Sequence, residues 1–203
     1  MKLPCLLQFR ILNLAVRALF GRPFTTAFPA GAYEPIKEFR GRPRFRAEEC
    51  IGCGACAAVC PSKCIEVLDE PLAVPPRRRL VQHLDACLCC GQCERYCTTT
   101  RGIRLTNEYD FAGFSPRDFE ERVEKPLLLC ECCGEVLAPL DQLRWLVGRL
   151  GPLAFANPTL LLVSCSELRV VAEGVKTESG DVQRFQRVSI QCPKCRRKTA
   201  LAV

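Results

Sequence analysis

Histidine, methionine and tryptophan are nearly absent from this chain of 203 residues: it contains one histidine, one methionine and one tryptophan. The single imidazole, that of His83, argues against a histidine-rich metal site and against a Ser–His–Asp triad. The chain also lacks an uncharged run of about 18 apolar residues, which argues against a simple transmembrane helix. Disorder and a collagen-like repeat are excluded, because hydrophobic residues make up 48% of the sequence and charged residues 25%.

Cysteine is the residue in excess. Seventeen cysteines in a chain of this length indicate either a disulfide scaffold or a metal protein, and their spacing has to distinguish the two. Ten of them fall within residues 47–106, and six within residues 130–203. The length itself fits one domain or two small ones.

Positive charge is concentrated at the N-terminal end. The net charge is +7, and residues 1–46 carry nine Lys or Arg against two Asp or Glu. Residues 47–129 are mildly acidic and residues 130–203 mildly basic, so the basic end is a local feature. It predicts a protein partner or an anionic membrane surface. Nucleic acid is a weaker expectation, because these arginines alternate with Pro, Gly and Phe and do not line a helix.

Residues 3–20 are predicted to form an apolar helix. The apolar side chains at helical spacing are Leu3, Leu7, Ile11, Leu14 and Ala18. A narrow polar stripe opposite them is formed by Arg10, Asn13 and Arg17. These polar residues argue against a secretory signal, and each Arg at the middle of a bilayer would cost roughly 2.5–3.5 kcal/mol. A helix that docks at a membrane interface or on a subunit fits best, with an ordinary core-packing helix as the alternative.

The remaining segments divide the chain further. Residues 22–46 are proline-rich and aperiodic, which predicts an extended docking arm, and residues 107–129 are predicted to be a polar connector. Residues 130–203 are predicted to form a metal-binding subdomain with a helix at 140–150. Its apolar strand-like runs are residues 159–164, 168–175 and 185–190.

Two cysteine runs with the same spacing occur within residues 47–106. Each has the spacing C-x2-C-x2-C-x3-C, and the second lies 37 residues after the first: Cys50, Cys53, Cys56 and Cys60, then Cys87, Cys90, Cys93 and Cys97. This internal duplication has the spacing of bacterial proteins that hold two 4Fe–4S clusters. In such runs three cysteines bind one cluster and the fourth binds the other. The predicted ligands are Cys50, Cys53, Cys56 and Cys97 for cluster 1, and Cys87, Cys90, Cys93 and Cys60 for cluster 2.

Other interpretations of the duplicated run are weaker. A disulfide framework does not explain two identical runs, and zinc sites use paired cysteine knuckles. The second run has Thr98 where a proline is expected after the fourth cysteine. Cys64 and Cys89 are extra; Cys64 could compete with Cys60, and Cys89 is predicted to be a bystander.

The residues around the cysteines are suited to enclosing clusters. Glycines allow the loops to curl around a cluster, and they are Gly52, Gly54 and Gly91. Ile51 and Leu88 are predicted to shield the clusters from water. The halves are joined by a predicted hairpin over residues 65–84, with Arg77–Arg79 expected at a solvated loop tip.

The tail carries a further cysteine site. Cys130 and Cys133 form one knuckle and Cys192 and Cys195 a second, with 58 residues between the two knuckles. Four thiolates from two knuckles predict a tetrahedral zinc site, with a rubredoxin-like iron as the alternative. Cys132 offers an alternative register, and Cys165 is expected to be buried.

The order of these features resembles a known family. The resemblance is carried by the segments EPIKEFRGRPRF (34–45), CIGCGACAAVCPSKCIEV (50–67), and the tail pair CECCGEVLAPLDQLRWL and CPKCRRK. They resemble the ferredoxin-like subunit of formate hydrogenlyase and of group 4 membrane-bound [NiFe] hydrogenases, and its counterpart in respiratory complex I. The resemblance implies two cubane clusters between a distal electron donor or acceptor and the large and small subunit pair. It further implies a peripheral position on the cytoplasmic side of the membrane, without an active site of its own.

Three functions are compared on this basis. The preferred one is an electron-transfer subunit of a membrane-associated complex; the alternative is a free soluble ferredoxin, to which an apolar helix and arm would be of no use. A nucleic-acid module built on the tail, with basic residues 194–198, lacks interleaved aromatics and is disfavoured. The expected fold is α+β: a two-cluster ferredoxin-like domain with two short hairpins and two short helices, an N-terminal helix and arm, and a C-terminal zinc-ribbon or rubredoxin-like subdomain.

Overall fold

The structure is a computed structural model that describes residues 9–21, 25, 28–31, 33–168 and 189–201. It divides into two units, Met1–Phe39 and Arg40–Val203. The helices and strands are α1 (Phe9–Phe20), β1 (Pro43–Phe45), α2 (Ala55–Ala58), β2 (Ile65–Glu70), β3 (Arg77–His83), α3 (Gln92–Arg95), β4 (Ile103–Leu105), β5 (Glu120–Leu129), β6 (Val136–Pro139), α4 (Leu140–Leu150), α5 (Pro158–Glu167) and α7 (Pro193–Leu201). Short 3-10 turns cover Leu84–Ala86, Pro116–Phe119 and Gly151–Ala156.

The first unit contains α1, which confirms the expected helix from Phe9 onward; residues 3–8 lie outside the described residues. The helix ends where Gly21 donates its backbone N–H to the carbonyl of Arg17 at 2.8 Å. None of its residues is buried. Its large exposed apolar side chains are those of Phe9, Ile11, Leu12, Leu14, Val16, Leu19 and Phe20.

Within the described residues, no single helix has the length and apolar character needed to cross a membrane. One bent pair, Leu140–Ala156 with Pro158–Glu167 at 119°, meets the requirement by length and composition only.

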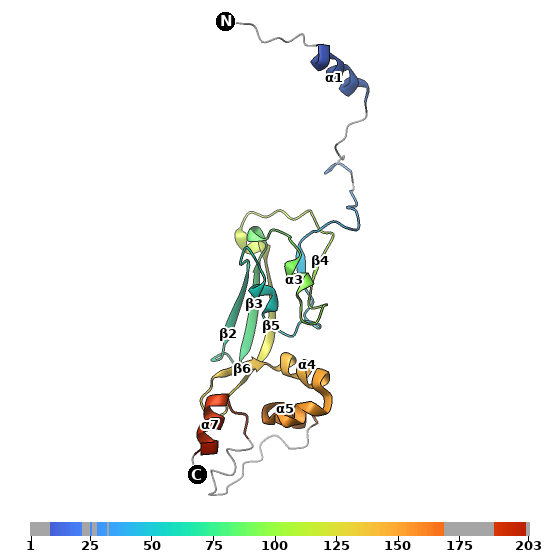
Figure 1. Cartoon of the computed structure of the whole chain (residues 1–203). Coiled ribbons are helices and arrows are strands. Elements are labelled where there is room, and N and C mark those ends of the chain that lie inside the picture. The colour runs from blue at the N-terminus through green and yellow to red at the C-terminus, as the bar shows by residue number, and fades with distance from the viewer. Residues whose placement is uncertain (1–8, 22–24, 26–27, 32, 169–188, 202–203) are drawn as a thin grey trace. The chain divides into compact units, whose positions relative to one another are not determined.

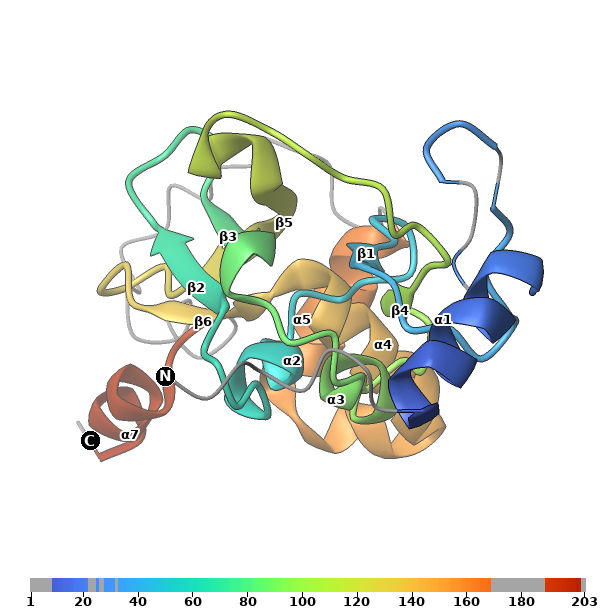
Figure 2. The ribbon, with the colours of Figure 1, turned by 90° about the horizontal axis from the view of Figure 1, so that it is seen from above.

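The second unit is built on two antiparallel sheets. Strands β1 and β4 form a two-stranded sheet, and the other four strands form a sheet in the order β2-β3-β5-β6. Figure 1 shows β2, β3 and β5 side by side, with β6, α4 and α5 at one end of the sheet. The two short helices α2 and α3 lie next to each other, as the view from above shows (Figure 2).

The hairpin expected over residues 65–84 is present as β2 and β3, paired from Ile65–Gln82 to Glu70–Arg77. The expectation for Arg77–Arg79 was wrong, because these residues begin β3 and do not form a loop tip. Acidic side chains on the neighbouring strands neutralise them: Arg77 contacts Glu70 at 2.8 Å and Arg78 contacts Asp69 at 2.6 Å. The charges that suggested a solvated loop therefore stabilise strand pairing.

The segment 107–129, expected to be a connector, ends in the ten-residue strand β5. This strand pairs with β3 along its length, from Arg77 opposite Pro126 to His83 opposite Glu120. On its other side it pairs with β6, with a register shift between Leu128 and Leu129. Strand β5 therefore joins the cysteine-rich half and the tail in one sheet.

The tail contains the expected helix at 140–150, which is α4. The prediction of a strand at residues 159–164 was wrong, because these residues lie in helix α5. Asn157 caps this helix by accepting from the N–H groups of Thr159 and Leu160, and Pro158 occupies its first turn. A short apolar run does not by itself separate a strand from a buried helix. The strand-like runs at 168–175 and 185–190 lie almost wholly outside the described residues.

Cysteines form a prominent part of the hydrophobic core of the second unit. One cluster of buried residues contains Cys56, Cys64, Ile65, Cys93 and Ile103, and another contains Cys50, Leu80 and Val123. The tail has a conventional core of Leu143, Ala154, Leu160 and Val163. A cysteine-lined core is the arrangement expected where bound metal replaces part of the apolar interior.

Candidate metal centres

The sequence duplication is repeated in the backbone. Residues 37 positions apart share left-handed backbone angles: φ is 69° at Gly52 and 48° at Cys89, 77° at Gly54 and 79° at Gly91, and 53° at Lys63 and 61° at Thr100. Gly54 and Gly91 are the N-cap residues of the four-residue helices α2 and α3, each of which carries the third cysteine of its run. The two loops thus present their thiols in the same way.

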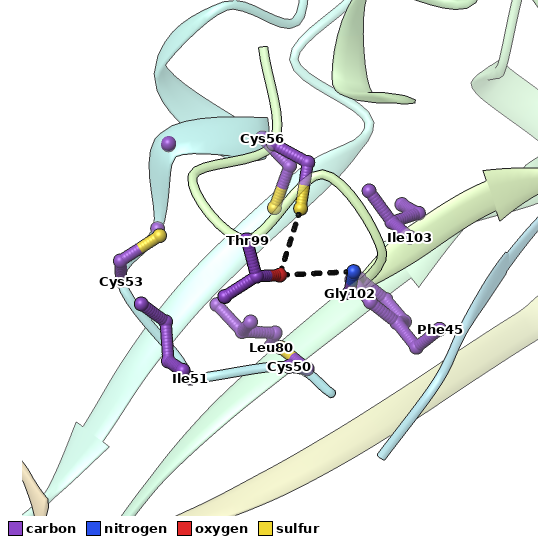
Figure 3. Close-up of a pocket in the computed structure, with 12 residues that line it drawn as sticks. Phe45, Cys50, Ile51, Cys53, Cys56, Leu80, Thr99, Gly102 and Ile103 are labelled. Atoms are coloured by element: carbon purple, nitrogen blue, oxygen red, sulfur yellow. Dashed lines mark hydrogen bonds between the residues drawn. The ribbon is translucent and has the colours of Figure 1, made fainter. Parts of the chain in front are cut away.

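The first cavity has about 300 Å³ of space free of protein atoms, part of it open to solvent. Its lining includes the four cysteines predicted for cluster 1, namely Cys50, Cys53, Cys56 and Cys97. Apolar side chains from β1, β3 and β4 complete the wall, and Figure 3 shows Phe45, Leu80 and Ile103 around the cysteine loop. Ile51 also lines this cavity and is buried, in the position expected of a shield against water.

The second cavity has about 320 Å³ of space free of protein atoms, part of it open to solvent. Its lining includes the four cysteines predicted for cluster 2, namely Cys60, Cys87, Cys90 and Cys93. Leu88 lines it too, but this side chain is 68% exposed, and Cys90 is exposed. The second cavity therefore reaches the surface at Leu88, whereas Ile51, the residue at the same position of the first run, is buried.

Burial sets the pKa of the third cysteine in each run. Burial of the thiol raises the pKa of Cys56 to about 12 and that of Cys93 to about 11. Thiols surrounded by apolar groups resist ionisation unless a cation compensates. Iron supplies such a charge, so the buried thiols become ligands only together with the metal.

The fourth cysteine of each run has the opposite shift. Burial works to raise the pKa of Cys60 and Cys97, but hydrogen bonds to sulfur outweigh it and lower both values. The hydroxyl of Ser62 lies 3.5 Å from Cys60 Sγ, and that of Thr99, 37 residues later, lies 3.4 Å from Cys97 Sγ. Thr99 Oγ1 also accepts from the Gly102 N–H at 3.1 Å, as Figure 3 shows. Ser62 and Thr99 are therefore part of the candidate sites, and the spacing of the cysteines did not reveal them.

Thr98, which replaces the expected proline, has a contact of its own. Its Oγ1 lies 3.2 Å from Cys53 Sγ, across the first cavity's loop. The substitution therefore places a hydroxyl next to a predicted ligand of cluster 1. Neither neighbouring ligand is displaced, since Cys53 and Cys97 both line the cavity.

Of the two extra cysteines, Cys64 is the one whose sulfur contacts the sulfur of a predicted ligand. It is 3% exposed, and its Sγ lies 3.4 Å from Cys60 Sγ. Burial raises the pKa of Cys64 to about 12, so this thiol stays protonated beside Cys60. Cys89 is half-buried in the second loop and donates its backbone N–H to Cys87 Sγ at 3.4 Å.

A buried cation lies close to the first loop. Lys125 of β5 is 8% exposed and donates to the Ala47 carbonyl at 2.5 Å and to Asp141 at 2.8 Å. Its charge lowers the pKa of Cys50, although burial raises that pKa overall. Sequence reasoning missed Lys125, because a lysine in an apparent connector suggests a solvated residue.

The tail cysteines also come together. The sulfur atoms of Cys130, Cys133, Cys192 and Cys195 all lie within 4.8 Å of one another. Although burial opposes ionisation, backbone N–H groups of residues 192, 133 and 132 lower the pKa of Cys130 to about 6. Cys132, the alternative in the sequence, is exposed and outside this group; Cys165 of α5 is half-buried.

All three groups of thiols fit metal by their donor set. The sixteen cysteines within the described residues are free thiols, and twelve of them belong to these groups. Four sulfur donors around an enclosed, largely apolar space fit a 4Fe–4S cluster, and four sulfurs in mutual contact fit a single tetrahedral ion.

Known proteins share parts of this sequence. A family model described as a 4Fe–4S dicluster domain matches residues 36–101. The chain is 30% identical over 97 residues to NAD(P)H-quinone oxidoreductase subunit I of Gloeobacter violaceus, covering 46% of this chain and 46% of that protein. It is 28% identical over 115 residues to NADH-quinone oxidoreductase subunit I 2 of Geobacter metallireducens, covering 53% and 86%.

A third relative is matched over a longer stretch. The chain is 30% identical over 127 residues to formate hydrogenlyase subunit 6 of Escherichia coli, covering 62% of this chain and 68% of that protein. A chain of the membrane-bound sulfane sulfur reductase, an archaeal respiratory membrane complex, aligns at 24% identity with a TM-score of 0.37, covering 54% and 56%. The match thus spans less than half of the first relative and more than two thirds of the E. coli protein. The resemblance expected from the sequence is confirmed.

Proposed function

This chain belongs to the family of iron–sulfur subunits that includes formate hydrogenlyase subunit 6, and we propose that it relays electrons through two 4Fe–4S clusters within a membrane-associated oxidoreductase complex. The observation that carries the proposal is the pair of cavities, each lined by four cysteines and related by the 37-residue duplication. In each set, three cysteines come from one run and the fourth comes from the other.

The roles of the residues follow from this assignment. Cys50, Cys53, Cys56 and Cys97 would hold cluster 1, and Cys87, Cys90, Cys93 and Cys60 would hold cluster 2. Bound there, each cluster supplies a site that accepts and releases one electron without making or breaking a substrate bond. The hydroxyls of Ser62 and Thr99 stabilise negative charge on the fourth thiolates, and buried Ile51 excludes water from the first site.

Electrons need an entry and an exit at the surface. The second cavity reaches the surface where it is lined by the exposed residues Leu88 and Cys90. We place a contact with a partner there. The partners are the large and small subunits of a hydrogenase-like or complex I-like assembly and a further electron-transfer subunit, with no nucleic acid.

The N-terminal unit favours a subunit over a free ferredoxin. Helix α1 exposes seven large apolar side chains, and a freely diffusing carrier would lose solubility by keeping them in water. The relatives bear the names of subunits of quinone oxidoreductases and of formate hydrogenlyase. We propose that α1 and the basic arm dock on partner subunits or on the cytoplasmic face of the membrane.

The tail site has a different role. Cys130, Cys133, Cys192 and Cys195 would bind one zinc ion or one iron ion, and zinc would serve as a structural staple without redox chemistry. Such a staple connects the turn between β5 and β6 to α7, and Leu137 of β6 packs against the same cysteines. The chain is proposed to have no active site of its own.

The test is anaerobic isolation of the tagged chain from its native membranes. We expect co-purification with a large and small subunit pair, and two clusters per chain by iron and sulfide analysis and by electron paramagnetic resonance. Deletion of residues 1–39 is the matched comparison: it should retain both clusters and lose the partners. Recovery of the intact chain alone from the soluble fraction, with both clusters, would instead favour the free ferredoxin.

A further inference from the structure

Gln82 is a buried polar residue whose side chain has no protein partner. It lies in β3 between β2 and β5, opposite Ile65 on one side and Glu121 on the other, and is 0% exposed. Neither Nε2 nor Oε1 has a hydrogen-bond partner within the part of the chain that the structure describes. An amide removed from water without a hydrogen bond is unfavourable, so its presence in a core calls for a partner.

The surroundings of Gln82 indicate where that partner lies. Gln82 is part of the lining of the second cavity, together with all four cysteines predicted to bind cluster 2. Apart from the predicted ligands, the other buried residues of that lining are Pro43, Cys64 and Ile65. The side chains of Pro43 and Ile65 are hydrocarbon, and Cys64 already contacts Cys60. The partner available to the amide is therefore whatever the four cysteines of this cavity bind.

The duplication supplies an internal comparison. The residue 37 positions before Gln82 is Phe45, which lines the first cavity. At the same position of the repeat, one cavity thus presents a hydrocarbon ring and the other an amide with two N–H donors. Solvent exposure does not explain why the second cavity has the polar residue, because Gln82 is fully buried whereas Phe45 is only half-buried.

We propose that the side-chain amide of Gln82 donates an N–H···S hydrogen bond to the cluster held by Cys60, Cys87, Cys90 and Cys93 and raises its reduction potential. This inference rests on the proposed function. Reduction adds one electron, and hence one negative charge, to the cluster. A donor aimed at sulfur stabilises the reduced state more than the oxidised state, which makes the potential less negative.

The experiment is a redox titration of the full-length, cluster-loaded protein, followed by electron paramagnetic resonance. Gln82→Leu removes the donors at nearly the same volume, and Phe45→Leu is the matched control in the other cavity. In Gln82→Leu we expect the potential of one cluster to become more negative while the other stays unchanged. Phe45→Leu should leave the potential of the cluster that Gln82→Leu shifts unchanged.

A second measurement detects the hydrogen bond itself. In reduced protein carrying glutamine labelled with 15N at the side-chain amide, pulsed resonance should show a 15N coupling to one cluster. That coupling should disappear in Gln82→Leu and persist in Phe45→Leu. A general loosening of the fold would move the potential without abolishing a specific nitrogen coupling.

The outcomes separate this inference from the proposed function. If the wild-type chain holds no four-iron clusters, the proposed function fails. If both clusters are present and Gln82→Leu changes neither potential nor coupling, the amide is bonded to water, and the inference on Gln82 is overturned. Should Gln82→Leu fail to load cluster 2, Gln82→Met, which is unbranched and lacks N–H donors, is titrated in its place. Loss of the cluster in both variants would assign Gln82 to assembly and overturn its role in tuning.

Discussion

Cys60 and Cys64 are neighbouring thiols with different protonation behaviour, although both line the second cavity. Hydrogen bonds from Ser62 and Cys64 lower the pKa of Cys60 against the effect of burial, whereas burial raises the pKa of Cys64 to about 12. The thiolate is the metal ligand. The repeat predicted Cys60 from its register, and the structure adds the physical reason why Cys64 is suited to donate to that sulfur.

Replacing each of these thiols separately tests the assignment. Cys64→Ala should retain both clusters, whereas Cys60→Ala should lose about half of the iron, because one of the two clusters is missing a ligand. Iron content and the resonance spectrum of anaerobically purified protein measure this. Full iron content in Cys60→Ala together with loss in Cys64→Ala would reverse the two roles.

Gly52 and Cys89 occupy the same position of the repeat, with positive φ at both. A Cβ at Gly52 would lie 3.1 Å from the Cβ and Cγ of Lys125, so Gly52→Ala adds crowding to backbone strain. We expect it to cost about 1–2 kcal/mol of unfolding free energy. Cys89→Gly relieves the corresponding strain and should be at least as stable as wild type with both clusters retained.

Denaturant unfolding of the cluster-loaded chain under anaerobic conditions compares the two variants. A loss of iron in Cys89→Gly would make Cys89 a ligand and not a bystander. The repeat revealed which positions correspond, but it did not reveal that the second loop tolerates a cysteine where the first has glycine.

At the scale of single elements, β5 is the strand that sequence reasoning did not find. Its inward-facing residues are Val123, Lys125 and Leu127, so a charged residue interrupts the apolar alternation. Pro126 also suggests a break. Lys125 is satisfied by the Ala47 carbonyl and by Asp141, which are distant in sequence, and no local pattern predicts such partners.

The link made by Lys125 can be removed. Lys125→Met keeps the aliphatic stem and deletes both contacts, and we expect a loss of about 1–3 kcal/mol of unfolding free energy. Arg144→Met is the control: it removes the more exposed partner of the same carboxylate, together with the exposed Arg144–Glu167 pair, and should cost less than about 1 kcal/mol. Equal thermal unfolding midpoints for the two variants would contradict the importance of the buried link.

The pH dependence of this link has a defined sign. Burial raises the pKa of Asp141, but Lys125 and Arg144 lower it by more than burial raises it, so the folded-state pKa is below the ordinary 3.8. A carboxyl with a depressed pKa stabilises the fold above its ordinary value, and the contribution is lost as pH falls below 3.8. The stability difference between wild type and Lys125→Met should therefore shrink in that acid range.

Helix α5 illustrates a second limit at this scale. The apolar run that it contains was equally compatible with a strand, and the deciding feature was the preceding pair Asn157–Pro158. Asn157 accepts from two backbone N–H groups, which helix starts require and strands do not. The helices α2, α3 and α4 were predictable, because the cysteine spacing or clear periodicity determined them.

At the scale of the whole molecule, the proposed tail metal site can be tested separately from the two proposed clusters. Cys192→Ser removes one sulfur of the tail group, and we expect loss of one zinc or iron ion per chain with both cluster signals unchanged. Elemental analysis and resonance spectra of the same sample give both readouts. Loss of a cluster signal in this variant would mean that the tail is required to assemble the clusters.

The overall plan of the molecule was accessible from the sequence because metal ligation leaves regular spacing. The order of helix, arm, duplicated run and paired knuckles predicted the family and the cysteines that line each cavity. Contacts made across the sheet, such as those of Gln82 and Lys125, depend on strand register and were beyond reach of spacing alone.

Strand β5 has a consequence for anyone who dissects this protein. A chain cut after residue 106 would retain every cysteine of both runs, yet it would lose the strand that pairs with all seven residues of β3. The bare edge of β3 would then offer a row of unmet backbone hydrogen-bonding groups to any other strand. The shortest segment that can carry the clusters is thus not one that stays monomeric, and β5 protects the electron carrier from self-association.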